Sequence, residues 1–200
     1  MLIETERLIV RTFREDDIAA LYQIAYDPDV LEYCPDLLKR DVTEAEVLAF
    51  IRDYIRIDAE NDIDTRRCYA IENRETGEVM GCITFGKNHM LNEYEIGWMM
   101  RKQYTKKGYA SEAAQAYADY FCAAYGVEYL IVVMDVDNPA SYRAAENVDS
   151  SCLKSEPCTI ITTTDTVMII TISDVIPRLA PGANGFTVMC LLPGAVQRFD

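Results

Sequence analysis

The sequence predicts a single mixed α/β domain in which helices flank one sheet. Strand-like apolar runs and helical patterns follow one another in the order β-α-α-β-β-β-α-β-α. The run Tyr129–Val136 is apolar except for Asp135 and rich in β-branched residues, as in strands that are buried on both faces. A basic, glycine-bearing loop separates the strand that begins at Glu93 from the helix that ends before Gly126. Such a junction points backbone N–H groups and a helix dipole at its mouth, so it predicts an anion site, most often for phosphate.

The elements of the first third follow from helix caps and apolar spacing. Leu8–Phe13 is typical of a strand, and Asp16 or Asp17 can cap a helix that runs to about Tyr33. Asp27-Pro28 is expected to interrupt this helix, because proline disfavours the α conformation in the residue before it. Thr43-Glu44-Ala45-Glu46 is a capping box that opens a second helix. Its inward positions are Val47, Phe50, Ile51, Tyr54 and Ile55.

A hairpin, a third strand and a long helix follow. Cys68–Glu72 and Val79–Phe85 are predicted to pair across a turn at Thr76-Gly77. The strand from Glu93 places alternate apolar side chains on one face, namely Tyr94, Ile96, Trp98 and Met100. The long helix is predicted from about Tyr109 to Tyr125, with Gly126 as its end. After the strand Tyr129–Val136, the turn Asp137-Asn138-Pro139 should open a short helix that runs beyond Ala145.

Composition limits the function classes. Two hundred residues, half of them apolar, suit one domain with a substantial core. No apolar run reaches the length of a membrane span and the charged N-terminal stretch is unlike a secretory signal, so we expect a cytoplasmic protein without membrane association. A formal charge of −14 disfavours sequence-independent nucleic-acid binding, which needs a positive surface. The same charge is compatible with a cationic substrate, but it is also an ordinary means of solubility.

Metal and cysteine-based chemistry find little support in the sequence. The seven cysteines are scattered and odd in number, without a CxxC pair, so we expect reduced thiols and no metal. His89 is the single histidine, which argues against histidine-based metal or triad chemistry, and an exposed loop position is the simpler interpretation. No cysteine has an evident base partner, which disfavours a covalent acyl-enzyme route.

Three segments carry motifs: IETERLIVRTFREDDIAALYQI near the N-terminus, YEIGWMMRKQYTKKGYASEAAQAYADYF in the centre, and VDNPASYRAAEN. In this order, residues 1–146 resemble the GNAT family of N-acetyltransferases, in particular the branch with the ribosomal-protein-alanine N-acetyltransferases. The resemblance implies an acyl-CoA N-acyltransferase fold, a mixed sheet with flanking helices. It also implies acetyl-CoA as cosubstrate, with its pyrophosphate in the strand–loop–helix junction.

The resemblance assigns the pyrophosphate to backbone N–H groups of one loop, whose residues are Lys106, Lys107, Gly108, Tyr109, Ala110 and Ser111. Gly108 would allow close backbone approach, and Ala110 fills a position where the family accepts Gly or Ala. Lys106 departs from the family pattern, which has glycine there, so it should either strain the turn or add a positive charge facing the phosphate. An ordinary basic turn is the alternative for the loop taken alone.

The chemistry requires a base for the acceptor amine, because free amines are mostly protonated at neutral pH. Glu95 matches the position of a glutamate that this branch of the family often uses as base, acting directly or through water. A carboxylate that simply faces solvent is the alternative for Glu95. Glu93 lies two residues earlier on the same strand face and is a weaker candidate.

The remaining site residues also come from the resemblance. Asn138 would contact the pantetheine arm or the substrate, and Ser141 is a candidate proton donor to the leaving thiolate. Their simpler interpretation is a turn asparagine and a first-turn helix serine. Some family members place a tyrosine acid near Ala145, and alanine removes that route. The main chain of three residues would pair with the pantetheine amides: Trp98, Met99 and Met100. The Trp98 indole could line the acceptor slot or belong to the core.

The resemblance stops after Glu146. The family would continue with Lys, a small or apolar residue and Gly-Phe, followed by two strands that close the sheet, whereas this chain has Asn147-Val148-Asp149-Ser150. We hypothesise a frameshift, because one base deleted from codons for E-K-C-G-F-K-L-F-E-E-R-T gives E-N-V-D-S-S-C-L-K-S-E-P, the sequence from Glu146 to Pro157. The gene sequence, read in the alternative frame, tests this hypothesis.

Residues 147–200 therefore form an atypical tail in place of the family's C-terminal strands. All thirteen tyrosines lie at or before Tyr142, and the tail is rich in Thr, Ser, Ile and Val. Ile160–Ile172 has strong strand propensity but poor alternation, and Pro177–Gly185 resembles a loop. Without the closing strands, Tyr129–Val136 would have an exposed edge, on which the tail could either pair or stay disordered. We expect weak catalysis and poor solubility compared with an intact relative.

The sequence thus predicts an N-acetyltransferase that passes an acetyl group from acetyl-CoA directly to a primary amine, either a protein N-terminus or a small molecule. The protein would be a monomer or a homodimer. The alternative is a catalytically impaired CoA-binding protein with a truncated GNAT fold. A nucleotide-binding regulator is a remote third, because the loop lacks a Walker lysine followed by Ser or Thr and a Rossmann GxGxxG.

Overall fold

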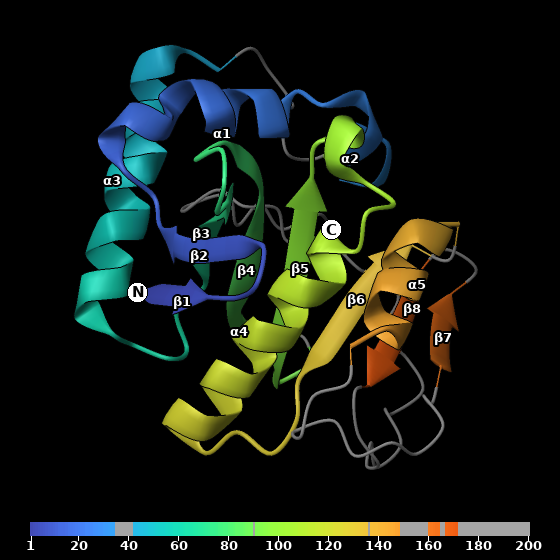
Figure 1. Ribbon diagram of the computed structural model, residues 1–200. Coiled ribbons are helices and arrows are strands. Elements are labelled where there is room, and N and C mark those ends of the chain that lie inside the picture. The colour runs from blue at the N-terminus through green and yellow to red at the C-terminus, as the bar shows by residue number, and fades with distance from the viewer. Residues whose placement is uncertain (35–41, 90, 136, 149–159, 165–166, 172–200) are drawn as a thin grey trace.

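The computed structural model contains one sheet of eight strands with helices on both faces (Figure 1). It describes residues 1–34, 42–89, 91–135, 137–148, 160–164 and 167–171. The strands are β1 (Leu2–Glu4), β2 (Leu8–Thr12), β3 (Arg67–Asn73), β4 (Val79–Asn88), β5 (Glu93–Met100), β6 (Ile131–Asp135), β7 (Ile160–Thr164) and β8 (Val167–Thr171). The helices are α1 (Ile18–Ala25), α2 (Pro28–Tyr33), α3 (Glu44–Glu60), α4 (Tyr109–Tyr125) and α5 (Pro139–Glu146), with short 3-10 turns η1 (Glu15–Asp17) and η3 (Lys102–Tyr104).

The strand order across the sheet is β1-β2-β3-β4-β5-β6-β8-β7. Neighbours from β1 to β5 are antiparallel, β5 and β6 are parallel, and β8 and β7 continue the sheet in antiparallel fashion. This confirms the predicted mixed sheet with flanking helices. The prediction omitted β1, because a three-residue strand carries no readable period.

Caps and turns set the helix boundaries where the sequence predicts them. The Asp27 carboxylate accepts a hydrogen bond from Asp29 N at 3.0 Å and Pro28 takes the first position of α2, so the chain breaks there into α1 and α2. Thr43 and Glu46 form the capping box of α3. Gly126 ends α4 in the left-handed conformation, at φ 64°.

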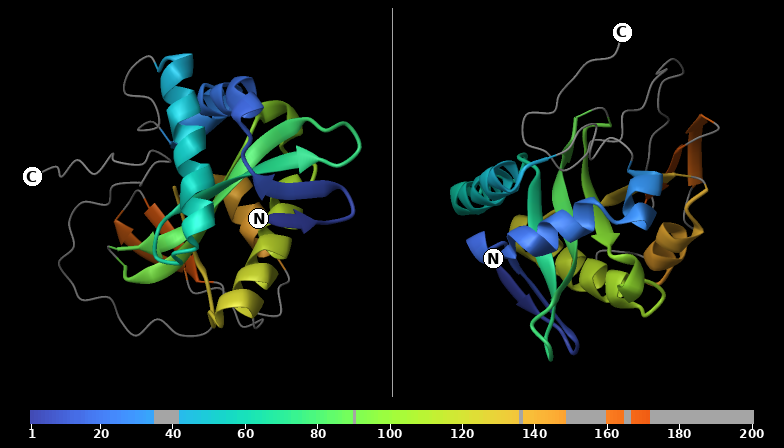
Figure 2. Two further views of the ribbon diagram at one scale, coloured as in Figure 1. Left: turned by 90° about the vertical axis from the view of Figure 1, so that its left-hand side faces the viewer. Right: turned by 90° about the horizontal axis from the view of Figure 1, so that it is seen from above.

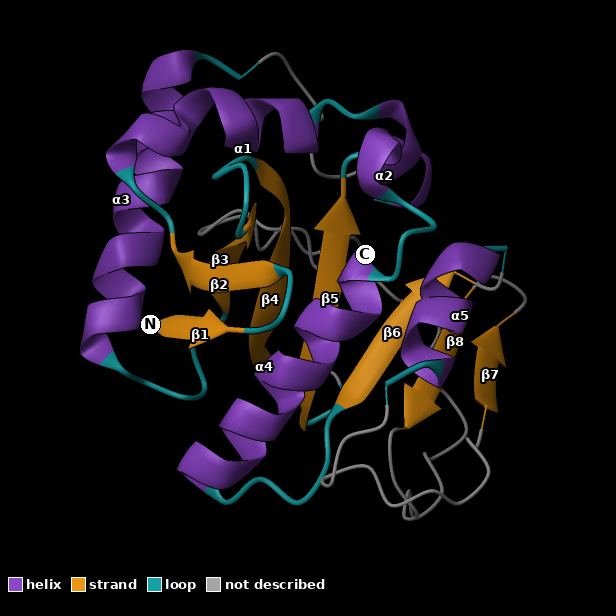
Figure 3. Ribbon diagram, viewed as in Figure 1, coloured by secondary structure: helices purple, strands orange, loops and turns teal. Residues whose placement is uncertain are grey.

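Two apolar clusters fill the two faces of the sheet (Figure 3). On one face, α4 packs against the strands through Ala113, Tyr117 and Phe121, and a ring stack joins Phe121 to Phe85 of β4 with centroids 3.7 Å apart. On the other face, α1 and α3 cover the sheet through Leu21, Ile24 and Ile51. Figure 2 turns the molecule so that α3 lies in front of the strands. The sheet is thus the middle layer of three.

The tail completes the sheet beside β6. The backbone of β8 pairs antiparallel along β6 from Ile131↔Thr171 to Asp135↔Val167, and β7 pairs with β8. The edge of the predicted strand Tyr129–Val136 is therefore covered by the tail, which was one of the two outcomes the sequence left open. Within the run Ile160–Ile172, the described residues Ile160–Thr164 and Val167–Thr171 form two paired strands, while Pro177–Gly185 lies outside the described residues.

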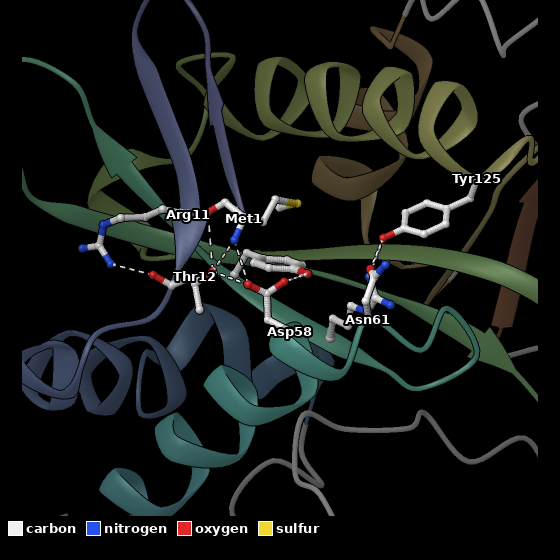
Figure 4. A network of polar contacts seen from close by, with 8 residues as sticks. Met1, Arg11, Thr12, Asp58, Asn61 and Tyr125 are labelled. Carbon is white, nitrogen blue, oxygen red and sulfur yellow. Dashed lines mark hydrogen bonds and ion pairs between the residues drawn. The ribbon is translucent and has the colours of Figure 1, made fainter.

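A polar network ties the first residue to α3 and β3 (Figure 4). The Met1 α-ammonium donates to Thr12 Oγ1 and to Asp58 Oδ2, each at 2.7 Å. The other Asp58 oxygen accepts a hydrogen bond from the Tyr69 hydroxyl at 2.6 Å. Although burial raises the pKa of Asp58, these hydrogen bonds outweigh it and hold the pKa below its ordinary value. The network joins Met1, β2 and β3 to α3.

Candidate active site

The loop before α4 presents backbone donors to solvent. Gly108 precedes the helix with φ 79°, a left-handed conformation that favours glycine. No side chain caps the first turn, and the helix hydrogen bonds begin with Glu112 N donating to Gly108 O at 3.0 Å. The N–H groups of the first turn therefore have no intrahelical acceptor, which suits them to an anion.

The residues that the sequence assigned to this loop lie together at the start of α4. Lys106, Lys107 and Gly108 are exposed, while Tyr109, Ala110 and Ser111 are half-buried in the first turn. Lys106 has φ 61°, so a lysine adopts the left-handed conformation where the family has glycine. Of the two predicted consequences of Lys106, a strained turn is therefore the one with a structural basis.

The strands β5 and β6 separate beside this loop. Their parallel pairing consists of one bridge, Glu95↔Ile131, and they diverge toward their C-terminal ends (Figure 1). On its other side β5 is fully paired with β4, through Trp98, Met99 and Met100 among others. Beyond the bridge, those backbone groups of this segment that face β6 have no ladder partner among the described strands. These groups are suited to the amides of an extended ligand.

Trp98 faces the α4 side of the sheet. Its side chain is half-buried and packs against the main core cluster. Of the two roles left open for the indole, the core role has contacts in the structure. The main-chain role predicted for Trp98 is independent of where the indole points.

Glu95 lies at the bridge itself, half-buried and held by two donors. Arg66 Nη2 lies 2.8 Å and Asn88 Nδ2 2.9 Å from the same oxygen, Oε2. No described residue donates to the other oxygen, Oε1. One oxygen is thus oriented by the protein while the other is left for a proton or a water. Glu93, the weaker candidate, instead contacts Tyr129: burial and the Glu93 carboxylate raise the pKa of the Tyr129 hydroxyl to about 12.

Arg66 also contacts β4. Its Nη1 lies 3.3 Å from Thr84 Oγ1, and its Nε is buried without a hydrogen-bond partner among the described residues. A Cβ added at Gly86 would lie 2.5 Å from Arg66 Cα, so glycine is required for this approach. Sequence analysis did not single out Arg66, Asn88 or Gly86, because none of them carries a local motif.

The thiol beside the site is unsuited to nucleophilic attack. Burial raises the pKa of Cys34 to about 11, with further contributions from Cys82 and Glu95. Cys34 therefore stays a protonated thiol at neutral pH. Nucleophilic attack requires the thiolate form. Among the described thiols, this argues against Cys34 in particular as a nucleophile.

Asn138 and Ser141 lie past the end of β6. Asn138 is buried, and its Oδ1 accepts a hydrogen bond from Ser141 N at 3.0 Å, which caps α5. Ser141 is half-buried, and its hydroxyl has no hydrogen bond to a described residue. Asn138 thus caps α5, and its contact with the pantetheine arm or the substrate stays a prediction, as does the role of the Ser141 hydroxyl. No hydrogen bond joins Glu95 to either residue.

Helix α2 connects the two sides of the strand opening. At one end, Asp27 Oδ2 accepts a hydrogen bond from Lys102 N at 2.8 Å, and Lys102 Nζ pairs with Asp29 at 2.8 Å. At the other end, the Tyr33 hydroxyl donates to Asp137 O at 3.1 Å. The start of η3 and the turn before α5 thereby both contact α2 or its N-cap residue. Sequence analysis did not predict these contacts.

Neither a metal centre nor a membrane span is found in the described part of the chain. Among the described residues, no group of three or more His, Cys, Asp or Glu side chains could hold a metal ion. Likewise, none of the described helices combines the length and the apolar character needed to cross a bilayer.

A mixed sheet that opens between two parallel strands beside an uncapped helix N-terminus is the arrangement of an acetyltransferase (GNAT) domain, and the sequence model of that domain matches residues 7–150. The chain therefore belongs to the GNAT acetyltransferase family. It is 32% identical over 148 residues to the N-acetyltransferase YnaD of Bacillus subtilis, covering 74% of this chain and 81% of the relative.

Solved structures show the same fold. A GNAT acetyltransferase from Bacillus anthracis has a TM-score of 0.65 at 25% identity, covering 86% of this chain and 97% of that one. RimL, a ribosomal L7/L12 α-N-protein acetyltransferase solved in complex with coenzyme A, has a TM-score of 0.67 at 16% identity, with 86% of this chain and 97% of that one covered.

Proposed function

We propose that this protein transfers the acetyl group of acetyl-CoA to a primary amine in a ternary complex. The proposal depends on one observation above all: β5 and β6 share a single bridge, next to the uncapped N-terminus of α4, within the residues that match the family. The N–H groups at Lys106–Ser111 would bind the pyrophosphate, and the main chain of Trp98–Met100 the pantetheine amides. RimL, with the same fold, is solved with coenzyme A, which supports this choice of cosubstrate.

The transfer needs one base and one acid. The amine nitrogen attacks the thioester carbonyl carbon, the C–S bond breaks, and the amine proton passes to Glu95, directly or through water. The free oxygen of Glu95 is the acceptor, while Arg66 and Asn88 hold the other oxygen in place. The Ser141 hydroxyl, which has no partner among the described residues, is the candidate donor to the thiolate.

The acceptor is proposed as a class. Either a protein N-terminus or a small amine would fit, and RimL, an α-N-protein acetyltransferase, supports the first by analogy of fold alone. We further propose a cytoplasmic protein that acts without a metal, without nucleic acid and apart from membranes, as a monomer or a homodimer.

Turnover of acetyl-CoA over a panel of amines and N-terminal peptides tests the proposal. We expect Glu95→Gln to lower kcat by about 10²–10⁴-fold, because glutamine keeps the hydrogen bonds to Arg66 and Asn88 but cannot take a proton. The matched control is Glu93→Gln, on the same strand face, which should leave kcat nearly unchanged. Equal rates for native protein and Glu95→Gln would exclude Glu95 as the base.

The second candidate is a CoA-binding protein with impaired catalysis. It is favoured by one observation, that β7 and β8 come from residues beyond the family match at 7–150. Calorimetry separates the two candidates, since the second predicts acetyl-CoA binding without turnover on any amine of the panel. Replacing residues 147–200 by the sequence of the restored reading frame should then raise kcat and solubility.

A further inference from the structure

We propose that Arg7 is a positioning residue for the phosphate-binding loop, defined here as Lys106–Ser111, and that it sets both the direction of a backbone donor and the charge at this loop. This inference rests on the proposed function. Arg7 belongs to the turn between β1 and β2, and it reaches the loop although the two are 100 residues apart in sequence.

The Arg7 guanidinium contacts three consecutive residues of the chain. Its Nη1 donates to Lys107 O at 3.0 Å, and its Cζ lies 4.7 Å from the centroid of the Tyr109 ring. A Cβ added at Gly108 would lie 3.4 Å from Arg7 Nη2, which places the guanidinium directly over the glycine. One side chain thus lies against the whole turn that enters α4.

The contact with Lys107 O fixes the direction of the next N–H group. The peptide bond between Lys107 and Gly108 is trans and planar, so its N–H points opposite to its C=O. With the carbonyl oxygen held by Arg7, the Gly108 N–H is directed away from Arg7. Lys106 at φ 61° and Gly108 at φ 79°, the residues before and after Lys107, both adopt the left-handed conformation.

Arg7 also neutralises a carboxylate at the start of α4. Glu112 lies in the first turn, where the helix would attract an anion, and its carboxylate is mostly buried. Arg7 Nε donates to Glu112 Oε2 at 2.6 Å and Arg7 N to Oε1 at 3.0 Å, while Thr5 Oγ1 donates to Oε1 at 2.5 Å. Burial raises the pKa of Glu112, but these hydrogen bonds outweigh it and place the pKa below its ordinary value.

Glu112 is therefore ionised at neutral pH, and without Arg7 it would repel a pyrophosphate at the same helix end. The arginine thus has two separable effects on the loop. One is geometric and acts through Lys107 O, and the other is electrostatic and acts through Glu112. Substitutions that remove one effect at a time distinguish them from a general loss of stability.

Arg74 offers a matched control, because it lies in the turn between β3 and β4 and its side chain contacts the β1–β2 turn. Its Nη1 donates to Thr5 O at 2.9 Å and its Nη2 lies 3.4 Å from Glu4 Oε2. The side chain is as exposed as that of Arg7, 50% against 44%, yet it makes no hydrogen bond or ion pair with the loop. Arg74→Met therefore perturbs the β1–β2 turn without touching the loop.

The test measures acetyl-CoA affinity by calorimetry and steady-state kinetics for four variants beside the native protein. We expect Arg7→Met to weaken acetyl-CoA binding and raise its KM by about tenfold, as for loss of a charge-assisted hydrogen bond, with kcat and the amine KM within about twofold. Arg7→Lys should be intermediate, since it keeps the charge but cannot reach both partners. Adding Glu112→Gln to Arg7→Met should recover part of the affinity, and Arg74→Met should match the native protein.

Hydrogen exchange without ligand gives a second readout. Amides of Lys106–Tyr109 should exchange faster in Arg7→Met than in the native protein, while those of the α4 interior stay protected in both. If Arg7→Met does not fold, the same comparisons are made with Arg7→Lys, which retains the ion pair with Glu112. An intermediate acetyl-CoA affinity and faster loop exchange in Arg7→Lys would then support the proposal. A native acetyl-CoA affinity together with native loop exchange would overturn it.

Two results refute the positioning role while leaving the proposed function intact. The first is native-like acetyl-CoA affinity and loop exchange in Arg7→Met. The second is an equal loss in Arg7→Met and Arg74→Met, without recovery on adding Glu112→Gln, which would indicate a structural role only. In contrast, native protein that binds no acetyl-CoA overturns the proposed function itself, and the present inference with it.

Discussion

A buried arginine between two carboxylates offers a direct test of what stabilises this fold. Arg11 of β2 is 4% exposed, and its Nε donates to Glu72 Oε2 of β3 at 2.6 Å. Its Nη1 and Nη2 donate to the two oxygens of Asp17 in η1, at 2.7 and 3.0 Å. Both carboxylates are buried, each 8% exposed. Replacing Arg11 by methionine keeps the length of the side chain, removes the cation from Asp17, and leaves Glu72 with only the exposed Arg14, whose Nη1 lies 3.8 Å from Glu72 Oε2.

We expect Arg11→Met to lower the free energy of unfolding by about 3–5 kcal/mol, the range for breaking a buried ion pair from one side. This is a large part of the usual total of about 5–15 kcal/mol. For a chain of this size, the midpoint of thermal unfolding should fall by roughly 10 °C. Urea unfolding followed by the fluorescence of Trp98, the single and half-buried tryptophan, measures the change.

The control is an exposed ion pair on the same 3-10 turn. Arg52 pairs with Glu15 at 2.8 Å, and the two side chains are 60% and 56% exposed. Arg52→Met should hardly move the midpoint, because exposed pairs are screened by solvent. Adding Asp17→Asn and Glu72→Gln to Arg11→Met should recover part of the loss, since the uncompensated charges are then gone. A similar small effect for Arg11→Met and Arg52→Met would refute the reasoning.

Three further substitutions test other parts of the structure. Asp58→Asn should destabilise the protein near neutral pH. Because folding lowers the pKa of Asp58, the difference in melting temperature between the variant and the native protein should vanish as pH falls from the ordinary pKa of 3.8 through the lower folded pKa. Lys106→Gly should stabilise the protein by about 1 kcal/mol in urea unfolding by relieving a left-handed lysine, and a loss of stability would contradict this. Gly86→Ala should cost about 1–3 kcal/mol and lower kcat, because its Cβ would displace the Arg66 backbone and so the contact with Glu95; unchanged turnover would exclude this coupling.

The elements beside the phosphate-binding loop were predictable because their signals are local. Gly108 and Gly126 lie at the two ends of α4, and the capping box Thr43–Glu46 opens α3. The break between α1 and α2 follows from Asp27-Pro28 for the same reason, as the cap and the proline are adjacent in the chain. Such rules depend on backbone geometry within one turn, so one sequence is enough to apply them.

The support of the site was not predictable, because its contacts join distant residues. Arg66 and Glu95 are 29 residues apart, and Arg7 and Glu112 are 105 apart. No period or cap couples such pairs, and only the folded sheet brings them together. Arg7 lies in the N-terminal segment that resembles the family. The resemblance, however, implies no role for Arg7. The frameshift stays a hypothesis that the coding sequence tests.

The hairpin β7–β8 illustrates that strand pairing at the edge of a sheet depends little on which side chains the strand carries. Ladder hydrogen bonds use only main-chain amides, which every residue except proline supplies alike. The strand β8, which lies beyond the family match at residues 7–150, therefore pairs with the backbone of β6 from Ile131 to Asp135. The interior strands, in contrast, depend on side chains that pack into an apolar cluster on each face of the sheet.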